Sequence, residues 1–280
     1  MYFSSFSQVF KCKVAGVMTM TFSLHDSYAS SAGPDCSETS GYSVSRTCVT
    51  PKENMHILRD KLQIPSAKGL MKRLRIDSLL EKSAAQFPAT LICGRAGSGK
   101  TAIAAGFAAK FKKVAWYTVE STDADWPVFS AYFSASLPAK AGFQNIFDGE
   151  VGSQADIATF LAWHASRLGS GKVDKKSLIV LDDIHHTFDA AWFDDFFNLL
   201  LHSLPPDAHL LLLCRSKPPG PLWRLRSKQM LNVIDEKIIA FNAVETEDLF
   251  DSLSISITHA QEAHRKSFGR VSKLLQFAAI

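Results

Sequence analysis

The stretch 94-GRAGSGKT-101 decides the fold of this 280-residue chain. It matches the pattern G-x-x-x-x-G-K-[ST] and carries one more glycine, Gly97, inside the loop. The apolar run 89-ATLIC-93 ends directly before it, and the alanine-rich stretch 102-AIAAGFAAKF-111 favours a helix directly after it. Glycines let backbone N–H groups curl around phosphate oxygens at a helix N-terminus, where the helix dipole favours an anion. This strand–loop–helix setting favours a phosphate-binding loop over an incidental glycine turn.

The residues of the loop have separate expected roles in holding a nucleotide. Lys100 should reach the β- and γ-phosphates, and the hydroxyl of Thr101 should bind Mg²⁺. The residues predicted to form this cofactor-binding loop are Gly94, Arg95, Ala96, Gly97, Ser98, Gly99, Lys100, Thr101 and Ala102. Taken alone, the loop indicates only that the site binds phosphate.

A second motif, 178-LIVLDD-183, is an apolar run that ends in two acids. Carboxylates in this position lie at the carboxyl edge of the sheet, where open α/β folds bind their ligands. We expect Asp182 to be the carboxylate on the Mg²⁺ side, as in a Walker B strand, and Asp183 to orient or activate the attacking water. The alternative is a pair of solvated acids that cap the next segment.

Arg215 ends another apolar run, 208-AHLLLLCR-215. In a five-stranded phosphate-loop sheet this strand lies between the two motif strands, so its tip can face the γ-phosphate. A guanidinium there would sense or stabilise phosphate charge, which makes Arg215 and Asp183 the predicted catalytic residues. The alternative is an arginine that simply leaves the core. The three motifs together predict ATP or ADP with Mg²⁺ as the cofactors.

Apolar runs alternate with helical stretches along the chain. Strands are expected at 89–93, 114–119, 177–183, 208–215 and 237–241, and helices at about 126–137, 154–168 and 190–204. Strands that are apolar throughout require a parallel sheet with both faces covered. The predicted fold is therefore α/β, a P-loop NTPase three-layer sandwich with a five-stranded parallel sheet, followed by a small C-terminal helical segment.

Composition and capping signals suggest three parts. Residues 1–50 are rich in Ser, Thr and Gly and are expected to be a disordered extension. Residues 51–243 are expected to form the nucleotide-binding domain, and residues 244–280 a helical lid segment. Asn242 and Glu245 form a predicted capping box before the apolar Leu249 and Phe250.

Charge, cysteine usage and hydropathy exclude several functional classes. The formal net charge of +4 is too small to indicate a nucleic-acid partner, and the basic run 215–228 is better explained as a solvated helix end. The five cysteines form no CxxC pair, and Cys93 and Cys214 lie in apolar runs, which favours a reducing compartment and a cytoplasmic location. No apolar run approaches the ~18 residues that span a bilayer. Trp116, Tyr117 and Trp126 are expected in the core or an interface.

The set of motifs, taken in order, resembles the nucleotide-binding part of the STAND ATPases, the signal-transduction ATPases with numerous domains. Within them, residues 57–280 are most similar to maltose-regulon-activator-like and large LuxR-type transcriptional regulators. The stretches that carry this resemblance are 61-KLQIP-65 with Arg73 and Arg75, 94-GRAGSGKT-101, 115-AWYTVESTDADWPVFSAYF-133, 180-VLDD-183, 212-LLCRSKPPGPLWRLR-226, 238-IIAFNAVETEDLF-250 and 268-FGRVSKLLQF-277. The resemblance implies that Ile64, Pro65 and Arg73 contribute to the adenine side of the site.

Three residues depart from the family pattern. Ala102 stands where a second Thr or Ser is usual, Cys214 replaces a small hydroxyl residue, and Arg270 stands where a Trp follows the glycine. Family members also continue into a winged helix, helical repeats and a DNA-binding helix-turn-helix, which are expected beyond Ile280 or on another chain.

The resemblance implies an ATP-binding switch that hydrolyses ATP slowly to ADP and phosphate and is linked to transcription regulation. ATP would favour a self-associating or partner-bound state, with no direct DNA or membrane binding by this chain. One alternative is a P-loop phosphotransferase acting on a small molecule. The other is an interaction scaffold that holds nucleotide without hydrolysing it.

Overall fold

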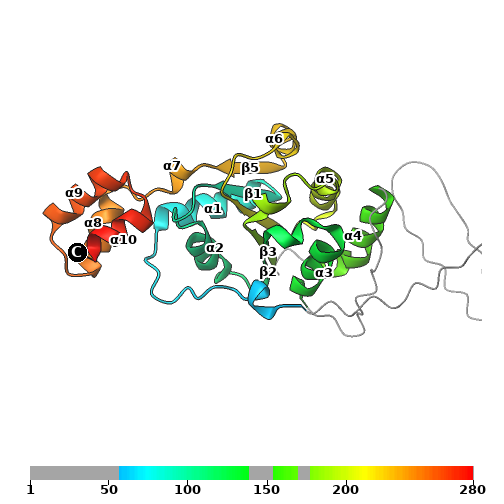
Figure 1. Cartoon of the computed structure of the whole chain (residues 1–280), viewed down its shortest axis with the longest axis horizontal. Helices are drawn as coiled ribbons and strands as arrows, with labels where there is room; N and C mark the ends of the chain where they lie inside the picture. The colour runs from blue at the N-terminus through cyan, green and yellow to red at the C-terminus, as the bar shows by residue number, and fades with distance from the viewer. Residues whose placement is uncertain (1–56, 139–153, 170–176, 280) are drawn as a thin grey trace, which may run out of the picture. The chain divides into compact units, whose positions relative to one another are not determined.

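A single sheet of five parallel strands forms the centre of the fold, in the order β2-β3-β4-β1-β5 (Figure 1). The structure is a computed structural model that describes residues 57–138, 154–169 and 177–279. The strands are β1 (Ala89–Cys93), β2 (Lys113–Thr118), β3 (Ser177–Asp182), β4 (Ala208–Cys214) and β5 (Leu231–Ile234). The order confirms that the strand leading to Arg215 lies between the two motif strands, and the predicted α/β P-loop class is correct.

Each side of the sheet carries its own hydrophobic cluster. Along β4, Leu211 and Leu213 belong to one cluster, and Leu210, Leu212 and Cys214 belong to the other. Because side chains alternate between the two faces of a strand, an uninterrupted apolar run needs cover on both.

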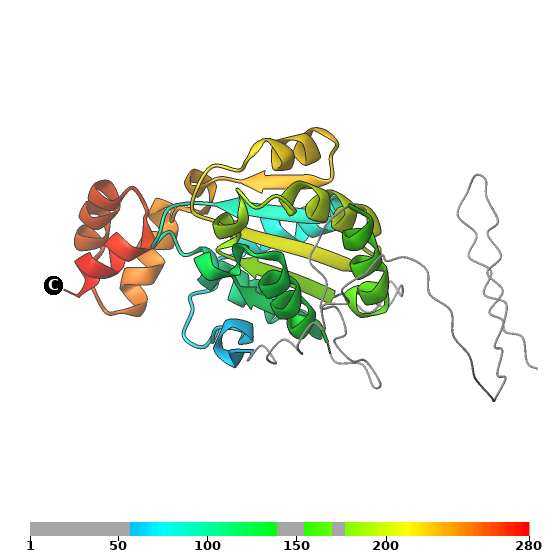
Figure 2. The same cartoon turned by 45° about the vertical axis from the view of Figure 1, so that its right-hand side comes forward.

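Helices from different parts of the chain supply this cover (Figures 1 and 2). Helices α1 (Leu74–Gln86) and α2 (Lys100–Ala108) contribute to the first cluster. Helices α3 (Trp126–Ser136), α4 (Gln154–Leu168) and α5 (Phe193–Ser203) contribute to the second. The described residues therefore form the three layers that the apolar strands required.

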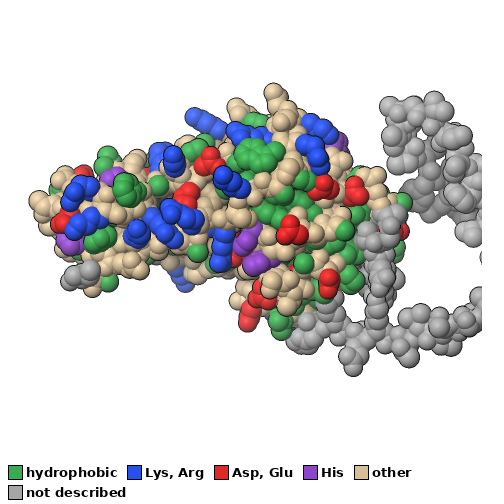
Figure 3. Space-filling view, turned by 45° about the horizontal axis from the view of Figure 1, so that its top comes forward, with side chains coloured by type: hydrophobic (Ala, Val, Ile, Leu, Met, Phe, Trp, Pro, Cys, Tyr) green, Lys and Arg blue, Asp and Glu red, His purple; other side chains and the backbone are tan. Residues whose placement is uncertain are grey.

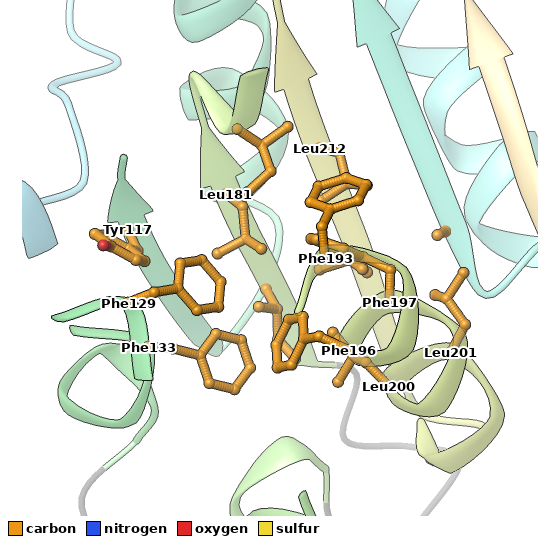
Figure 4. Close-up of a cluster of buried hydrophobic side chains, with 14 of the residues drawn as sticks. Tyr117, Phe129, Phe133, Leu181, Phe193, Phe196, Phe197, Leu200, Leu201 and Leu212 are labelled. Atoms are coloured by element: carbon orange, nitrogen blue, oxygen red, sulfur yellow. The ribbon is translucent and has the colours of Figure 1, made fainter. Parts of the chain in front are cut away.

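Aromatic rings fill the second cluster, as Figure 4 shows for Tyr117, Phe129 and Phe196. The centroid of the Phe129 ring lies 4.3 Å from that of Trp192 and 5.2 Å from that of Phe196. Offset and edge-to-face rings at such distances stabilise a core beyond the area they bury. The predicted core location of Tyr117, Trp116 and Trp126 is confirmed, since each is at most 4% exposed.

The fifth strand lies earlier in the sequence than predicted. Residues 237–241 were expected as a strand, but the edge strand is β5 (Leu231–Ile234), and residues Glu236–Ile239 form the one-turn helix α7. Pairing with β1 ends at Ile234 opposite Ile92, and Asp235 then precedes the helical turn. The short strand carries Asn232 in its middle and is only partly buried there, so its apolar signal is weaker than that of the run after it.

Shorter helices connect the main elements. They are η1 (Arg59–Leu62), η2 (Ser121–Ala124), η3 (Ile184–Thr187) and α6 (Gly220–Ser227). Lys61 of η1 is 8% exposed, and its Nζ lies 2.8 Å from Oδ1 of the buried Asp123 in η2. This paired charge anchors the start of the described chain beside β2.

Three helices, α8 (Ala243–Ser252), α9 (Ile257–Ser267) and α10 (Val271–Ala278), follow the sheet. They share a third hydrophobic cluster around Phe250 and Leu274. The predicted capping box is confirmed: Oδ1 of Asn242 accepts a hydrogen bond from the Glu245 N–H at 2.7 Å, and Oε2 of Glu245 accepts one from the Asn242 N–H at 3.1 Å.

Among the described residues, no helix combines the length and the apolar character that crossing a membrane requires. The expected extension at 1–50, with Cys12, Cys36 and Cys48, lies outside the described residues.

Candidate functional site

The phosphate loop connects β1 to α2 and has the backbone that its glycines permit. Gly97 has φ 75° and Gly99 has φ 89°, in the left-handed region where other residues are strained. Helix α2 begins at Lys100, with Gly99 as its N-cap residue. The loop therefore presents the N-terminus of α2 at the carboxyl edge of the sheet, which is a favourable place for an anion.

Lys100 lies folded over its own loop. Its Nζ donates hydrogen bonds to the carbonyl oxygens of Gly94 at 2.6 Å and Arg95 at 3.2 Å, and the residue is 5% exposed. Burial lowers the pKa of Lys100, and the nearby Asp183 and Asp182 carboxylates oppose that shift. The ammonium is thus held inside the loop, from which it could transfer to phosphate oxygens with little movement.

Thr101 and Asp182 are in direct contact. The Thr101 hydroxyl donates to Oδ2 of Asp182 at 2.8 Å, and the backbone N–H of Asp183 donates to Oδ1 at 2.9 Å. Burial raises the pKa of Asp182, which is 4% exposed, and the hydrogen bond from Thr101 opposes the rise.

These oxygen atoms suit a hard cation. Mg²⁺ commonly keeps several waters and uses one or two protein oxygens together with substrate phosphates. The described residues contain no group of three or more His, Cys, Asp or Glu side chains able to hold a metal by themselves. The pair of Thr101 and Asp182 therefore fits Mg²⁺ brought by a nucleotide, and does not fit a protein-only metal centre.

Asp183 and Arg215 form an ion pair between the ends of β3 and β4. Nε of Arg215 lies 2.9 Å from Oδ1 of Asp183, and Nη2 contacts Oδ2. Asp183 has φ 54°, in the left-handed region that residues other than glycine rarely adopt. The structure thus brings together the two residues that were predicted to be catalytic, and pairs them with each other.

Glu236 contacts the phosphate loop, which the sequence patterns do not predict. The carboxylate of Glu236 accepts hydrogen bonds from the Arg95 backbone N–H at 3.0 Å and from the Arg95 guanidinium. Glu236 adjoins the segment that was expected to be a strand, so no sequence signal marked it as a neighbour of the loop. Its pKa is lowered by the hydrogen bond from Arg95.

The start of α10 also lies against the loop. The Ser272 N–H donates to the Gly97 carbonyl at 3.1 Å, and the Arg270 guanidinium contacts the Ala96 carbonyl. A Cβ atom on Gly97 would lie 2.5 Å from the Ser272 hydroxyl oxygen, so the glycine at position 97 makes this close approach possible. Only the tertiary structure could show that the C-terminal helices touch the phosphate loop directly.

Arg73 is engaged by the part of the chain that follows β5. Its guanidinium donates to the carbonyl oxygens of Ile239 at 2.8 Å and Ala240 at 2.9 Å, and to Oε2 of Glu245 at 2.7 Å. Ile64 is 46% exposed. In the described chain Arg73 therefore ties the start of α1 to the end of α7 and the first turn of α8. The adenine-side role of Ile64, Pro65 and Arg73 stays a prediction.

The surface carries charges of both signs. On the face shown in Figure 3, Asp and Glu side chains lie among the Lys and Arg side chains. Within the basic run 215–228, Arg224 pairs with Asp194 at 3.0 Å, and the Arg226 guanidinium lies 5.0 Å from the centre of the Trp223 ring. Part of the positive charge of this run is thus already paired.

Comparison with known proteins finds distant sequence relatives and a solved structure with a similar fold. No protein family model matches the chain. Over 191 residues, 68% of its length, the chain is 26% identical to the HTH-type transcriptional regulator MalT of Serratia proteamaculans. Over 178 residues it is 28% identical to the regulator of the same name of Yersinia enterocolitica. The matches cover 21% and 20% of those proteins, so the chain spans about a fifth of the length of the curated relatives it matches.

A solved structure has a similar fold. It is the signal transduction ATPase with numerous domains (STAND) protein with a tetratricopeptide repeat sensor from Pyrococcus horikoshii. The TM-score is 0.52 at 20% sequence identity, with 75% of this chain and 30% of that chain covered.

Proposed function

We propose that this chain, a P-loop ATPase of the STAND class and MalT-like type, is the ATP-binding and slowly hydrolysing switch module of a signal-transduction ATPase linked to transcription regulation. One observation carries the proposal. Lys100 and Thr101 after β1, Asp182 and Asp183 at the end of β3, and Arg215 after β4 meet at one edge of the sheet, because these strands are adjacent in the order β3-β4-β1. Cations, carboxylates and a hydroxyl in this arrangement suit a nucleoside triphosphate.

Binding of ATP would replace contacts that the site now makes with itself. Lys100 would leave the Gly94 carbonyl for the β- and γ-phosphates, and the N–H groups at the start of α2 would donate to the same oxygens. Thr101 and Asp182 would hold Mg²⁺, which neutralises phosphate charge when bound. The 2.8 Å contact between these two side chains supports a shared ligand.

Hydrolysis would require Asp183 to act on water. Its carboxylate is now engaged by Arg215, so this pair must open before Asp183 can accept a proton or orient a water molecule. A γ-phosphate could draw the guanidinium toward itself and release the carboxylate. An acid that is free only part of the time supports slow turnover.

The switch would act through the C-terminal helices. Ser272 and Arg270 contact the phosphate loop, so a change in loop occupancy must be accommodated by α10. We therefore assign residues 51–243 as the nucleotide-binding domain and 244–280 as its lid. ATP and ADP would favour different positions of this lid, a population shift that exposes or hides surfaces for self-association or a partner chain. Use of ATP with Mg²⁺ favours a cytoplasmic location.

Lys100→Ala tests the binding site, with Lys110→Ala, an exposed lysine just after the end of the same helix, as the matched control. Lys100 would supply about two charge-assisted hydrogen bonds to phosphate, so the dissociation constants for ATP and ADP should rise about 100-fold. Isothermal titration calorimetry measures both constants. Unchanged affinity in Lys100→Ala would contradict the proposed function.

Asp183→Asn tests hydrolysis, with the exposed Asp189→Asn as control. Loss of a general base should lower the rate of ATP turnover about 100-fold. Chromatography of the products should show only ADP and free phosphate. Transfer of phosphate to an added small molecule would favour the phosphotransferase instead, and no turnover by the unmodified chain would favour the non-hydrolysing scaffold.

A further inference from the structure

Two cysteines lie side by side at the root of the phosphate loop. Cys93 ends β1 and Cys214 ends β4, and the two residues are direct partners in the parallel register. Their Sγ atoms are 3.0 Å apart, and both thiols are free. Cys214 is 0% exposed, whereas Cys93 is only partly buried.

The backbone geometry suits a covalent bond between these two sulfur atoms. Neighbouring strands lie about 4.8 Å apart, which is within the range of about 4.4–6.8 Å that Cα atoms span across a disulfide. Both side chains pack against the hydrophobic cluster on one face of the sheet. Because the sulfur atoms already converge, a movement of about 1 Å would bring them to the disulfide bond length of about 2.05 Å.

The surroundings give the two thiols different reactivity. The hydrogen bond with Cys214 lowers the pKa of Cys93 against the opposing effect of burial, and the positive charge of Lys100 acts in the same direction as the hydrogen bond. The contact with Cys93 and burial raise the pKa of Cys214. Cys93 is also the more exposed of the two. Thiolate character and access decide which cysteine reacts with an oxidant, so Cys93 would react first and Cys214 second.

We propose that Cys93 and Cys214 form a disulfide modification site that a hydroperoxide oxidises and that regulates the phosphate loop. In the first step the Cys93 thiolate attacks one oxygen of the peroxide, the O–O bond breaks, and protonation of the leaving oxygen gives water or an alcohol. The product is a sulfenic acid on Cys93. In the second step the Cys214 thiol attacks that sulfur, the S–O bond breaks, and water leaves with the thiol proton. The two thiols together lose two electrons and the peroxide gains them.

The disulfide would change the loop because the two cysteines adjoin its functional groups. Gly94 follows Cys93, its N–H donates to the Cys214 carbonyl at 3.1 Å, and its carbonyl accepts from Lys100. Arg215 follows Cys214. The bond would hold the loop root against the strand that carries Arg215 and oppose the rearrangement that phosphate requires. This consequence for nucleotide binding rests on the proposed function, whereas formation of the disulfide does not.

The test uses the full chain, reduced or treated with hydrogen peroxide, followed by alkylation, digestion and mass spectrometry. We expect a peptide cross-link between Cys93 and Cys214 that dithiothreitol reverses. The affinity for ATP should fall about tenfold on oxidation and recover on reduction, because a displacement of about 1 Å is enough to disable a preorganised site. In Cys93→Ser and Cys214→Ala peroxide should leave the affinity unchanged, and far-UV circular dichroism should confirm that both variants fold.

The outcomes separate the two proposals. Absence of the cross-link, or pairing of these cysteines with Cys12, Cys36 or Cys48 instead, overturns the modification site. A cross-link that leaves the ATP affinity of the chain unchanged, or an equal loss of affinity in Cys93→Ser, overturns its regulatory effect. If the reduced chain binds no ATP, the proposed function fails, while the mapped cross-link still decides the modification site.

Discussion

Glu245→Gln should make the stability of this chain depend less on acid pH, because Glu245 is a buried carboxylate between two arginines. Its side chain is 10% exposed, and Oε2 lies 2.7 Å from Nη2 of Arg73 and 2.9 Å from Nη2 of Arg75. Through these contacts the first turn of α8 is joined to the start of α1. The variant keeps the size of the side chain and removes its charge.

The magnitude follows from the pKa of Glu245. Burial alone would raise it, but hydrogen bonds from Arg75, Arg73 and the Asn242 N–H outweigh burial and lower the pKa from 4.5 to about 2. A pKa difference of this size corresponds to about 3 kcal/mol. Because Arg75 is 40% exposed and its interaction is screened by water, we expect about 2 kcal/mol.

The sign of the pH dependence is set by the lowered pKa. Above the unfolded pKa of 4.5 the carboxylate is charged in both states, and its full contribution stabilises the fold. As the pH falls from 4.5 to about 2, the unfolded state takes up the proton first, and the contribution is lost. The difference in stability between wild type and Glu245→Gln should therefore be about 2 kcal/mol at neutral pH and shrink through this range.

Urea unfolding followed by circular dichroism, at a series of pH values from neutral to acid, measures this difference. The exposed Asp248→Asn in the same helix is the control and should match wild type throughout. Other titrating groups are shared by wild type and variant, so their effects cancel in the difference. A difference that stays constant with pH, or is equal in Asp248→Asn, would show that the two arginines do not stabilise the charged form of Glu245.

Three further predictions test the packing of the fold. Gly269→Ala should destabilise by more than about 2 kcal/mol, because Gly269 has φ 73° and a Cβ there would lie 2.1 Å from the Phe241 carbonyl oxygen. A Cβ at Gly106 in α2 would meet nothing within 4 Å, so Gly106→Ala should raise the free energy of unfolding by about 0.5–1 kcal/mol. Urea unfolding measures both glycine variants, and equal changes in their free energies of unfolding would refute the predicted difference between the two positions. Burial lowers the pKa of His209 from 6.5 to about 4, so wild type should lose stability as the pH falls through that range. His209→Gln should lose less stability than wild type over this pH range, and an equal pH dependence of the free energy of unfolding in both proteins would contradict the prediction. Phe129→Ala should lower the free energy of unfolding by about 3–5 kcal/mol, and Phe129→Leu by clearly less, because the leucine leaves a smaller cavity. Equal losses in urea unfolding would show that the volume of the Phe129 ring does not determine the stability of this cluster.

Most of the sheet could be predicted because its strands carry strong local signals. The runs at 89–93 and 208–215 are apolar without interruption, and each adjoins a recognisable motif. The sequence pattern predicts the fifth strand at 237–241, and this is wrong, because the edge strand β5 pairs on one side only and needs less burial. Asn232 can therefore lie within β5, which weakens its apolar signal. Its position is set by the register with β1, which no local pattern encodes.

The candidate site was predictable to the same degree as the sheet. Carboxyl ends of parallel strands meet at one edge, so motifs at those ends had to lie together, as Thr101 with Asp182 and Asp183 with Arg215 do. What could not be predicted is which groups the site residues contact. Arg95 pairs with Glu236 and Ala96 accepts from Arg270, over sequence separations of 141 and 174 residues.

The sequence by itself determined the phosphate loop, the acidic strand end and the parallel sheet that holds them. These features depend on residue types at short spacing, where glycine conformations and apolar periodicity act directly. The tertiary structure alone decided that the start of α10 lies on Gly97 and that Cys93 and Cys214 bring their sulfur atoms to 3.0 Å. Such contacts depend on strand order, register and helix docking, which are set by packing of the whole domain and by no single segment.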